Sequence, residues 1–406
     1  MSVAAESTAL NEGRVSIGTT TFRRANLALF CAGFVTFVTL YDVQPLLPLF
    51  SREFNVPPAM GSLPLSISTA AMAIAMLLAG TLSETLGRKP VMAVSLFLTS
   101  LLACLTLFSH SFSTLLALRL AQGVVLAGVP SVAMAYLGEE MDARSIGAAM
   151  GLYISGNAVG GMIGRIGSAL LCDYLPWHAA IGIIGLFSLL LSLVFLKSLP
   201  PSASFRPRPF QARYLFTSLQ QHLRDPGLLC LYGLAFLGMG GFVTLYNYIG
   251  FRLLAPPYGL GQSQVSLIFL VYLLGSFSSG VIGRLIHRFG RGPMIRLTLA
   301  TMFAGTLLTL ATPLPLIVAG VGIFTCGFFG AHAIASSWVG RRARSAKAQA
   351  SSLYLFFYYL GSSVSGTVGG LFWVHLGWPG VAAMIGLLVL LAFLVSALLL
   401  RLPVME

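Results

Sequence analysis

Long apolar stretches alternate with short polar ones along almost the whole chain of 406 residues. A helix needs about 20 mostly apolar residues to cross the hydrocarbon core of a bilayer. The sequence supplies twelve such stretches, each bounded by polar residues, proline or glycine. We therefore expect twelve membrane-spanning helices, at residues 26–50, 63–82, 90–109, 113–135, 147–170, 178–196, 228–251, 264–283, 293–311, 315–338, 351–374 and 379–400.

The longest polar interruption, at residues 197–227, is basic and proline-rich at its start and divides the predicted spans into two sets of six. We expect an N-terminal tail (1–25), two six-helix bundles (26–196 and 228–406) and a linker between them. Residues 211–223 form either a short amphipathic helix on the membrane surface or part of a plain solvated linker. The sequence leaves both possibilities open.

Composition and charge support a membrane protein. Hydrophobic residues make up 57% and charged residues 9% of the chain, whereas a soluble domain carries about 25% charged residues. If both termini are cytoplasmic, only Arg52 and Arg252 of the 24 basic residues lie in outer loops, and Arg119 and Arg165 lie within spans. This bias predicts cytoplasmic termini, so the net charge of +13 requires no nucleic-acid partner.

The two predicted bundles share an internal repeat. Residues 37–42 (FVTLYD) match residues 242–247 (FVTLYN), and Trp177 matches Trp378. Matches of this kind in the same order indicate two halves with the same orientation in the membrane. In transporters with such parallel repeats, substrate binds near the bilayer midplane at the interface of the halves.

Three motifs in the first half resemble those of the major facilitator superfamily. One follows the second span and consists of Gly80, Glu84 and Gly87-Arg88-Lys89, although Thr85 stands where a basic residue is usual. The fourth span contains Arg119-x-x-Gln122-Gly123. The fifth resembles the antiporter motif but has glycine at 161 and Arg165 where the family pattern has proline and glycine; its other glycines include Gly156, Gly160 and Gly164.

The sequence therefore resembles the twelve-helix drug:proton antiporter branch of this superfamily. Within this branch it resembles the YnfM-type transporters, and residues 151–157 and 348–354 carry that match. The resemblance implies an all-α membrane fold of two six-helix pseudo-repeats, a monomer in the bacterial inner membrane, and a proton gradient in place of a cofactor. It also implies that Glu84 docks near the start of the eleventh helix. The face formed by Gly156, Gly160 and Gly164 would seal the fifth helix against the opposite half.

Asp42 is the strongest candidate for chemistry, because it alone among the 11 acidic residues lies well inside a span. At about 1.5 Å per residue, Asp42 lies roughly 12 Å, Arg119 roughly 9 Å and Arg165 roughly 8 Å from the outer ends of their helices. We hypothesise that Asp42 couples protons and that Arg119 modulates it. The alternatives are a structural or cavity-lining Asp42 and arginines that snorkel to the outer interface.

Candidate substrate contacts are the polar and aromatic residues expected near the interface of the halves. Asn247 takes the place of Asp42 in the second half, and His332 is either a titratable cavity residue or a packed polar side chain. The full set of predicted cavity residues is Tyr41, Gln44, Gln122, Tyr246, Asn247 and His332.

These features predict proton-coupled export of a small organic compound. The alternatives are proton-coupled uptake of a sugar, amino acid or carboxylate and, in another class, a sensor or lipid-handling protein on the same fold. We expect no enzyme and no metal site, because the sequence has no nucleotide-binding loop and no nucleophile with a base. Its five cysteines show neither a CxxC pattern nor zinc-site spacing.

Overall fold

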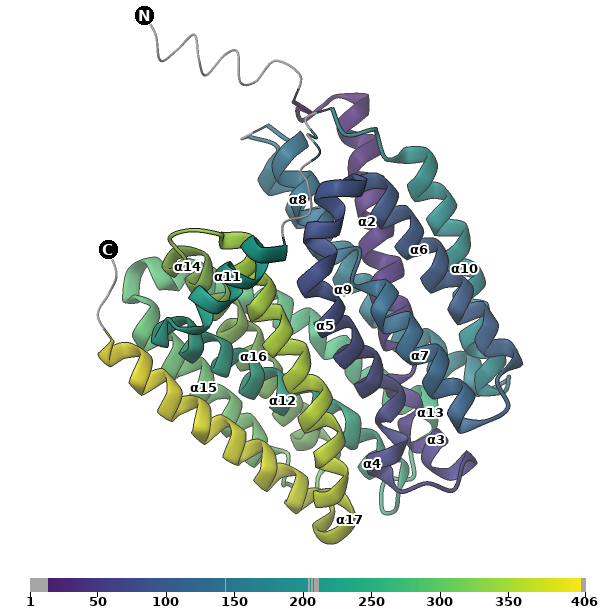
Figure 1. Cartoon of the computed structure of the whole chain (residues 1–406). Coiled ribbons are helices and arrows are strands. Elements are labelled where there is room, and N and C mark those ends of the chain that lie inside the picture. Colours follow the sequence, from purple (N-terminus) through teal and green to yellow (C-terminus); the bar gives the residue numbers. More distant parts are fainter. Residues whose placement is uncertain (1–13, 143, 204, 206, 208–211, 403–406) are drawn as a thin grey trace, which may run out of the picture.

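The computed structural model describes residues 14–142, 144–203, 205, 207 and 212–402, and these form an all-helical molecule (Figure 1). Most of the predicted N-terminal tail, residues 1–13, lies outside the described residues, as do Arg206 and Arg208 of the linker. The first half contains α2 (Thr20–Tyr41), η1 (Gln44–Leu46), α3 (Leu47–Glu53), α4 (Pro58–Gly61), α5 (Leu63–Leu86), α6 (Arg88–Leu105), η2 (Thr106–Phe108), α7 (Phe112–Leu126), α8 (Pro130–Glu140), α9 (Ile146–Cys172) and α10 (Trp177–Ser198). The second half contains α11 (Ala212–Leu223), α12 (Pro226–Leu254), α13 (Gln262–Ser266), η3 (Leu267–Val271), α14 (Tyr272–Phe289), α15 (Arg291–Leu308), α16 (Leu314–Arg342) and α17 (Lys347–Arg401).

The predicted fold class is confirmed, and each predicted span has a helical counterpart. Within the described residues, ten helical segments are long and apolar enough to cross a membrane. One of them, the 55-residue α17, contains two predicted spans. These are separated at Gly377, where the backbone leaves helical geometry (φ 61°, ψ −149°). Positive φ favours glycine, so this residue lets the chain turn between the last two spans. The 18-residue α15 accounts for the remaining predicted span.

The first span is interrupted where the candidate acid lies. Proline lacks the N–H that continues a helical ladder, and Pro45 and Pro48 follow Tyr41 closely. As a result α2 ends at Tyr41, a short 3-10 turn covers Gln44–Leu46, and a new helix starts at Leu47. Asp42 is the C-terminal cap of α2, with its backbone N–H donating to the Val38 carbonyl at 3.2 Å.

Helices of the two halves form two groups that meet at one side of the molecule (Figure 1). We call this the α4 side, because α4 and α13 lie there, and the other the α11 side. Hydrogen bonds join the groups on the α4 side: Gln44 donates to Asn247 at 2.9 Å, Gln262 donates to the Pro45 carbonyl, and Ser263 donates to Asp173. Toward the α11 side the two groups diverge (Figure 1). The structure is thus closed on the α4 side.

Residues 212–223 form the amphipathic helix α11, so a plain linker is the wrong alternative for this segment. Its buried face includes Leu215 and His222, while Phe216 is 71% exposed. The Nε2 atom of His222 lies 3.1 Å from the Ala346 carbonyl oxygen, just before α17 begins. The helix therefore packs its buried face against the second bundle.

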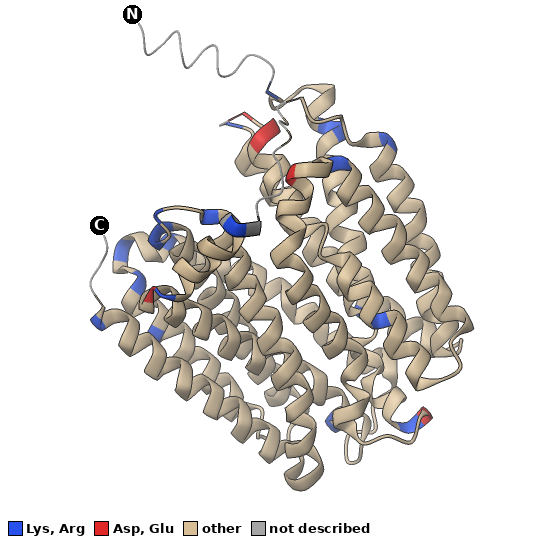
Figure 2. Ribbon diagram, in the orientation of Figure 1, with Lys and Arg blue, Asp and Glu red and all other residues tan. Residues whose placement is uncertain are grey.

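Most basic residues lie at the α11 side, and few lie at the α4 side (Figure 2). This distribution is the one expected if the α11 side faces the cytoplasm. The orientation of the chain in a membrane stays a prediction.

Asp225 links two helices at the α11 side. Its Oδ1 atom accepts hydrogen bonds from the backbone N–H groups of Gly227 (2.7 Å) and Leu228 (3.0 Å), which caps α12, and from Arg342 Nε (2.8 Å) at the end of α16. Partial burial opposes ionisation, but the bonds from Arg342 and Leu228 leave the pKa of Asp225 below its ordinary value.

We expect Asp225→Ala to lower the free energy of unfolding by about 1–2 kcal/mol, as the loss of a helix cap does. Because the folded-state pKa is lowered, the carboxylate's contribution is fully present above the unfolded-state pKa and disappears as pH falls through the folded-state value. Thermal unfolding of the purified variant at pH 7 and at decreasing pH measures both effects. Glu53→Ala, at an exposed position at the end of α3, is the control. A variant as stable as the wild type at pH 7 would contradict this role.

Candidate functional site

Asp42 and Arg119 form an ion pair inside the first bundle. Arg119 Nη1 on α7 lies 3.2 Å from Asp42 Oδ1, and the two side chains are 1% and 0% exposed. The structure thus brings together the acid and one of the two arginines that the sequence singled out. Since Arg119 is buried, the snorkelling alternative is wrong for this residue.

Arg119 also caps the broken end of α2. Its guanidinium donates to the carbonyls of Thr39 (2.8 Å) and Leu40 (2.7 Å) at this end. It also donates to the carbonyl of Pro64 in the first turn of α5 (3.2 Å). The last carbonyls of a helix have no amide partner of their own and carry partial negative charge, so a cation stabilises them. The local break at Pro45 therefore explains why a guanidinium can be held at this depth.

One carboxylate oxygen of Asp42 remains without a partner. Oδ1 contacts Arg119, whereas Oδ2 is buried and has no hydrogen-bond partner among the described residues. A protonated carboxyl group gains one O–H donor and needs a place for that hydrogen. Oδ2 is the oxygen at which Asp42 can take up a proton without first breaking a hydrogen bond.

Gln122 lies in the same network and not in a cavity. Its Oε1 atom accepts from Arg119 at 2.6 Å, its Nε2 atom donates to the Thr99 carbonyl at 3.3 Å, and the residue is 2% exposed. Both ends of the amide are therefore occupied, and Gln122 is not available to a substrate in this conformation.

Arg165 on α9 occupies the interface of the two bundles. Its Nε atom donates to Gln44 Oε1 at 2.6 Å, and its guanidinium carbon lies 3.8 Å from the ring centre of Tyr41. Gln44 in turn donates to Asn247 of the second bundle at 2.9 Å. Arg165 is 3% exposed, and Gln44 and the Tyr41 ring hold its guanidinium inside the protein. The snorkelling alternative is therefore also wrong for this residue. The sequence marked Arg165 in two ways, as a basic residue within a span and as an arginine at a glycine position of the helix 5 motif.

Tyr246 is buried within the second bundle. Its hydroxyl group lies 2.8 Å from Thr325 Oγ1, and its ring lies 4.9 Å from that of Tyr272. Tyr272 in turn lies against the Arg165 guanidinium, at 4.8 Å from its ring centre. Tyr246 therefore contacts the interface through another ring.

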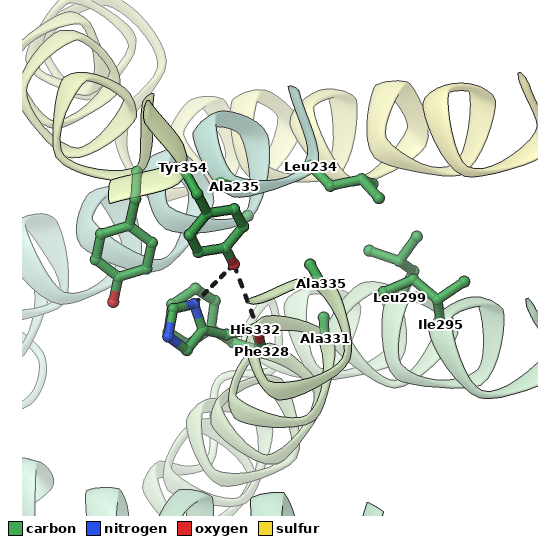
Figure 3. Close-up of a pocket in the computed structure, with 11 residues that line it drawn as sticks. Leu234, Ala235, Ile295, Leu299, Phe328, Ala331, His332, Ala335 and Tyr354 are labelled. Atoms are coloured by element: carbon green, nitrogen blue, oxygen red, sulfur yellow. Dashed lines mark hydrogen bonds between the residues drawn. The ribbon is translucent and has the colours of Figure 1, made fainter. Parts of the chain in front are cut away.

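His332 lies in a separate pocket (Figure 3). Its Nδ1 atom is 2.9 Å from the Tyr354 hydroxyl, and its ring is 4.9 Å from that of Tyr358. Apart from His332 and these tyrosines, the pocket is apolar, and it is lined by Leu234, Ala235, Gly238, Ile295, Leu299, Phe328, Ala331 and Ala335. Its lining residues all come from the second bundle. The predicted cavity residues thus lie in four places: the Arg119 network (Gln122), the interface of the bundles (Tyr41, Gln44 and Asn247), this pocket (His332) and the interior of the second bundle (Tyr246).

The loop motif after α5 is held within the first bundle. Arg88 forms an ion pair with Glu139 of α8 at 2.6 Å and donates to Ser83 and to the Gly80 carbonyl. Gly87 has φ of 95°, which favours glycine at this turn. Among the described residues, Glu84 forms no hydrogen bond or ion pair. Its implied docking at the start of α17 is therefore absent from this conformation, in which the bundles diverge.

The glycine face of α9 packs against α2 of the same bundle. A Cβ atom built on Gly156, Gly160 or Gly164 would lie within 2.5 Å of a carbonyl oxygen of Phe30, Phe34 or Val38 respectively. The implied role of this face, a seal against the opposite half, is therefore wrong for this structure. Small residues allow two helix backbones to approach closely, and here they join the fifth span to the first.

Comparisons with known proteins agree with this architecture. The model of the Major Facilitator Superfamily matches residues 27–364 and 250–406. An uncharacterized MFS-type transporter of Bacillus subtilis (strain 168), YybF, is 52% identical over 384 residues, 95% of each chain. The inner membrane transport protein YnfM of Escherichia coli (strain K12) is 48% identical over 379 residues, 93% of this chain and 91% of YnfM.

A solved structure shows the same fold. A crystal structure of a mutant nucleoside transporter, NupG, superposes with a TM-score of 0.74 over 93% of this chain and 99% of NupG, at 14% identity. The family model and the two relatives cover nearly the whole chain. The chain is a multi-pass membrane transporter and belongs to the Major Facilitator Superfamily.

Proposed function

We propose that this transporter exports a small organic compound across the bacterial inner membrane in exchange for protons. The observation that carries the proposal is the buried pair of Asp42 and Arg119, in which Asp42 Oδ2 has no partner among the described residues. An ionisable group at membrane depth is costly and is a functional-site candidate by default. The energy source is the proton gradient.

The pair is suited to a proton that loads on one side and leaves on the other. Burial favours the protonated form of a carboxyl group, whereas a neighbouring guanidinium favours the ionised form. These influences oppose one another at Asp42, so a change in water access or in the distance to Arg119 shifts the balance. Arg119 keeps its three carbonyl acceptors when the carboxyl is neutral, so the proton can bind without leaving the arginine unpaired.

The proposed orientation is compatible with export. With both termini cytoplasmic, the α11 side faces the cytoplasm, and the divergence of the bundles there leaves the transporter ready to take substrate from inside. The resemblance of α9 to the antiporter motif supports exchange rather than symport. Rocking of one bundle against the other would then open the α4 side.

A susceptibility screen combined with proton flux tests this proposal. We expect overexpression to raise resistance to a subset of organic compounds. Each such compound should release protons from the lumen of energised everted vesicles, compared with vesicles from cells carrying the empty vector. Proton movement into the lumen together with the compound would indicate export by symport, and compound-driven flux in right-side-out vesicles alone would indicate uptake. Absence of flux with every compound would contradict a transporter coupled to protons and favour the sensor or lipid-handling alternative.

A further inference from the structure

Arg165 is a buried cation without an acidic partner among the described residues. Asp42, the acid that lies within a span, pairs with Arg119. The hydrogen bonds of Arg165 go to neutral acceptors, Gln44 Oε1 at 2.6 Å and the Gly161 carbonyl at 2.7 Å. The described membrane interior around these residues therefore carries one positive charge that the protein does not neutralise. Such a charge is expensive at this depth and marks a functional site.

Two buried polar groups beside Arg165 also lack partners among the described residues. They are the Nδ2 atom of Asn247 and the hydroxyl group of Tyr272. Tyr272 lies against the guanidinium, with its ring centre 4.8 Å from the Arg165 Cζ atom, and Asn247 is joined to Arg165 through Gln44. Buried donors without acceptors are costly to maintain. A cation of the first bundle without an acidic partner, next to unpaired donors of the second bundle, is the arrangement expected of a site for an anion.

Aromatic rings surround the charge. The Arg165 Cζ atom lies 3.8 Å from the ring centre of Tyr41 on the first bundle and 5.1 Å from that of Phe269 on the second. Tyr272 contacts Phe242 with ring centres 5.4 Å apart, and Phe242 stacks on Phe328 at 4.0 Å. Phe328 lines the His332 pocket. Rings thus continue from Arg165 into the second bundle, so an apolar, flat body beside the guanidinium would find aromatic partners.

We propose that Arg165 binds the carboxylate of an aromatic organic acid and that this class of anion is the transported substrate. The inference rests on the proposed transport function and deepens it by naming the substrate class. Arg165 supplies the charge and a forked set of donors that suits a carboxylate. Asn247 Nδ2 and the Tyr272 hydroxyl group supply further donors, and the rings hold the aromatic body.

Gln44 couples anion binding to the closed α4 side. Its Oε1 atom accepts from Arg165 while its Nε2 atom donates to Asn247 of the opposite bundle. A carboxylate on Arg165 Nε takes the place of Gln44 Oε1, which releases one end of this bridge between the bundles. Substrate binding therefore loosens a contact that must break before the α4 side can open. With the α4 side outward, the inside-negative potential drives an anion in the direction of export.

Three probes with one ring system and different charges test the inference: 1-naphthoate, 1-naphthamide and 1-naphthylmethylammonium, with binding to the purified full-length protein measured at pH 7. We expect the wild type to bind the carboxylate about tenfold to a hundredfold more tightly than the amide, the range for a hydrogen bond to a charged group. The ammonium probe should bind most weakly. If the amide or ammonium probe binds the wild type as tightly as the carboxylate, the inference is overturned without any variant.

Variants then assign the preference to Arg165. Arg165→Gln should bind carboxylate and amide equally, and Arg165→Lys should keep part of the preference because it keeps the charge. Arg52→Gln removes a positive charge from an exposed position on the α4 side and should leave all three affinities unchanged. A folded Arg165→Gln protein that retains the carboxylate preference would refute the assignment.

The binding assay separates this inference from the proposed function, because it needs no proton gradient. If the carboxylate binds through Arg165 but no compound drives proton flux, the anion site stands and proton-coupled export fails. If proton flux accompanies export while the three probes bind without preference, proton-coupled export stands and the anion site fails.

Discussion

Asp42→Asn is expected to abolish proton-driven transport while the protein still folds. Asparagine has nearly the same shape as aspartate but takes up no proton in this pH range. Arg119 would keep its contacts to the carbonyls of Thr39, Leu40 and Pro64 and to Gln122. The loss of transport against a gradient should be complete within the sensitivity of a vesicle assay, whereas exchange of substrate at equal concentrations on both sides should persist.

Uphill transport and counterflow measured in the same proteoliposomes distinguish a coupling role from a structural one. A merely structural Asp42 would lower both rates together with the melting temperature. Removing one partner of a buried ion pair typically lowers the free energy of unfolding by about 3–5 kcal/mol. We expect a smaller loss here, because Arg119 also caps the end of α2. Glu53→Gln, at an exposed acid, should keep both rates. Undiminished proton coupling in Asp42→Asn would refute the role proposed for this residue.

Gly160→Leu is expected to prevent normal folding of the first bundle. A Cβ atom at this position would lie 2.3 Å from the carbonyl oxygen and 2.7 Å from the Cα atom of Phe34. These are backbone atoms of α2, so no side-chain rotation relieves the collision and the two helices must move apart. Overpacking lowers the free energy of unfolding by about 1–3 kcal/mol and sometimes more. Because the collision here is with backbone atoms, we expect a loss of about 3 kcal/mol or above for this variant.

Gly151→Leu provides a matched control on the same helix. Gly151 is exposed, and a Cβ atom there would meet nothing within 4 Å. Leucine is a better helix former than glycine, so this variant should be as stable as the wild type. Size-exclusion profiles and melting temperatures of both detergent-solubilised variants give the comparison. A Gly160→Leu protein with wild-type stability would show that α2 and α9 do not need the close approach seen here.

The sequence alone determined the helices of this protein. A spanning helix must be apolar along its own length, because the bilayer offers no water to satisfy exposed polar groups. That requirement is local, so the twelve stretches and the turn between the spans 351–374 and 379–400 can be recognised along the chain. The break at Pro45 lies inside the predicted span 26–50 and was found only in the structure. The unusual depth of Asp42 could be recognised for the same reason, since acids are rare at such positions. The family and its fold followed from motifs that are also local.

Only the tertiary structure decided which side chains meet. Asp42 and Arg119 are 77 residues apart in the chain, and Gln44 and Asn247 are 203 apart. Depth in the membrane was similar for Arg119 and Arg165, but depth does not say toward which neighbouring helix a side chain points. Packing therefore determined that Arg119 pairs with Asp42 while Arg165 lies among aromatic rings. It also determined that the α9 glycines contact α2, because a small-residue face permits close approach without specifying the partner.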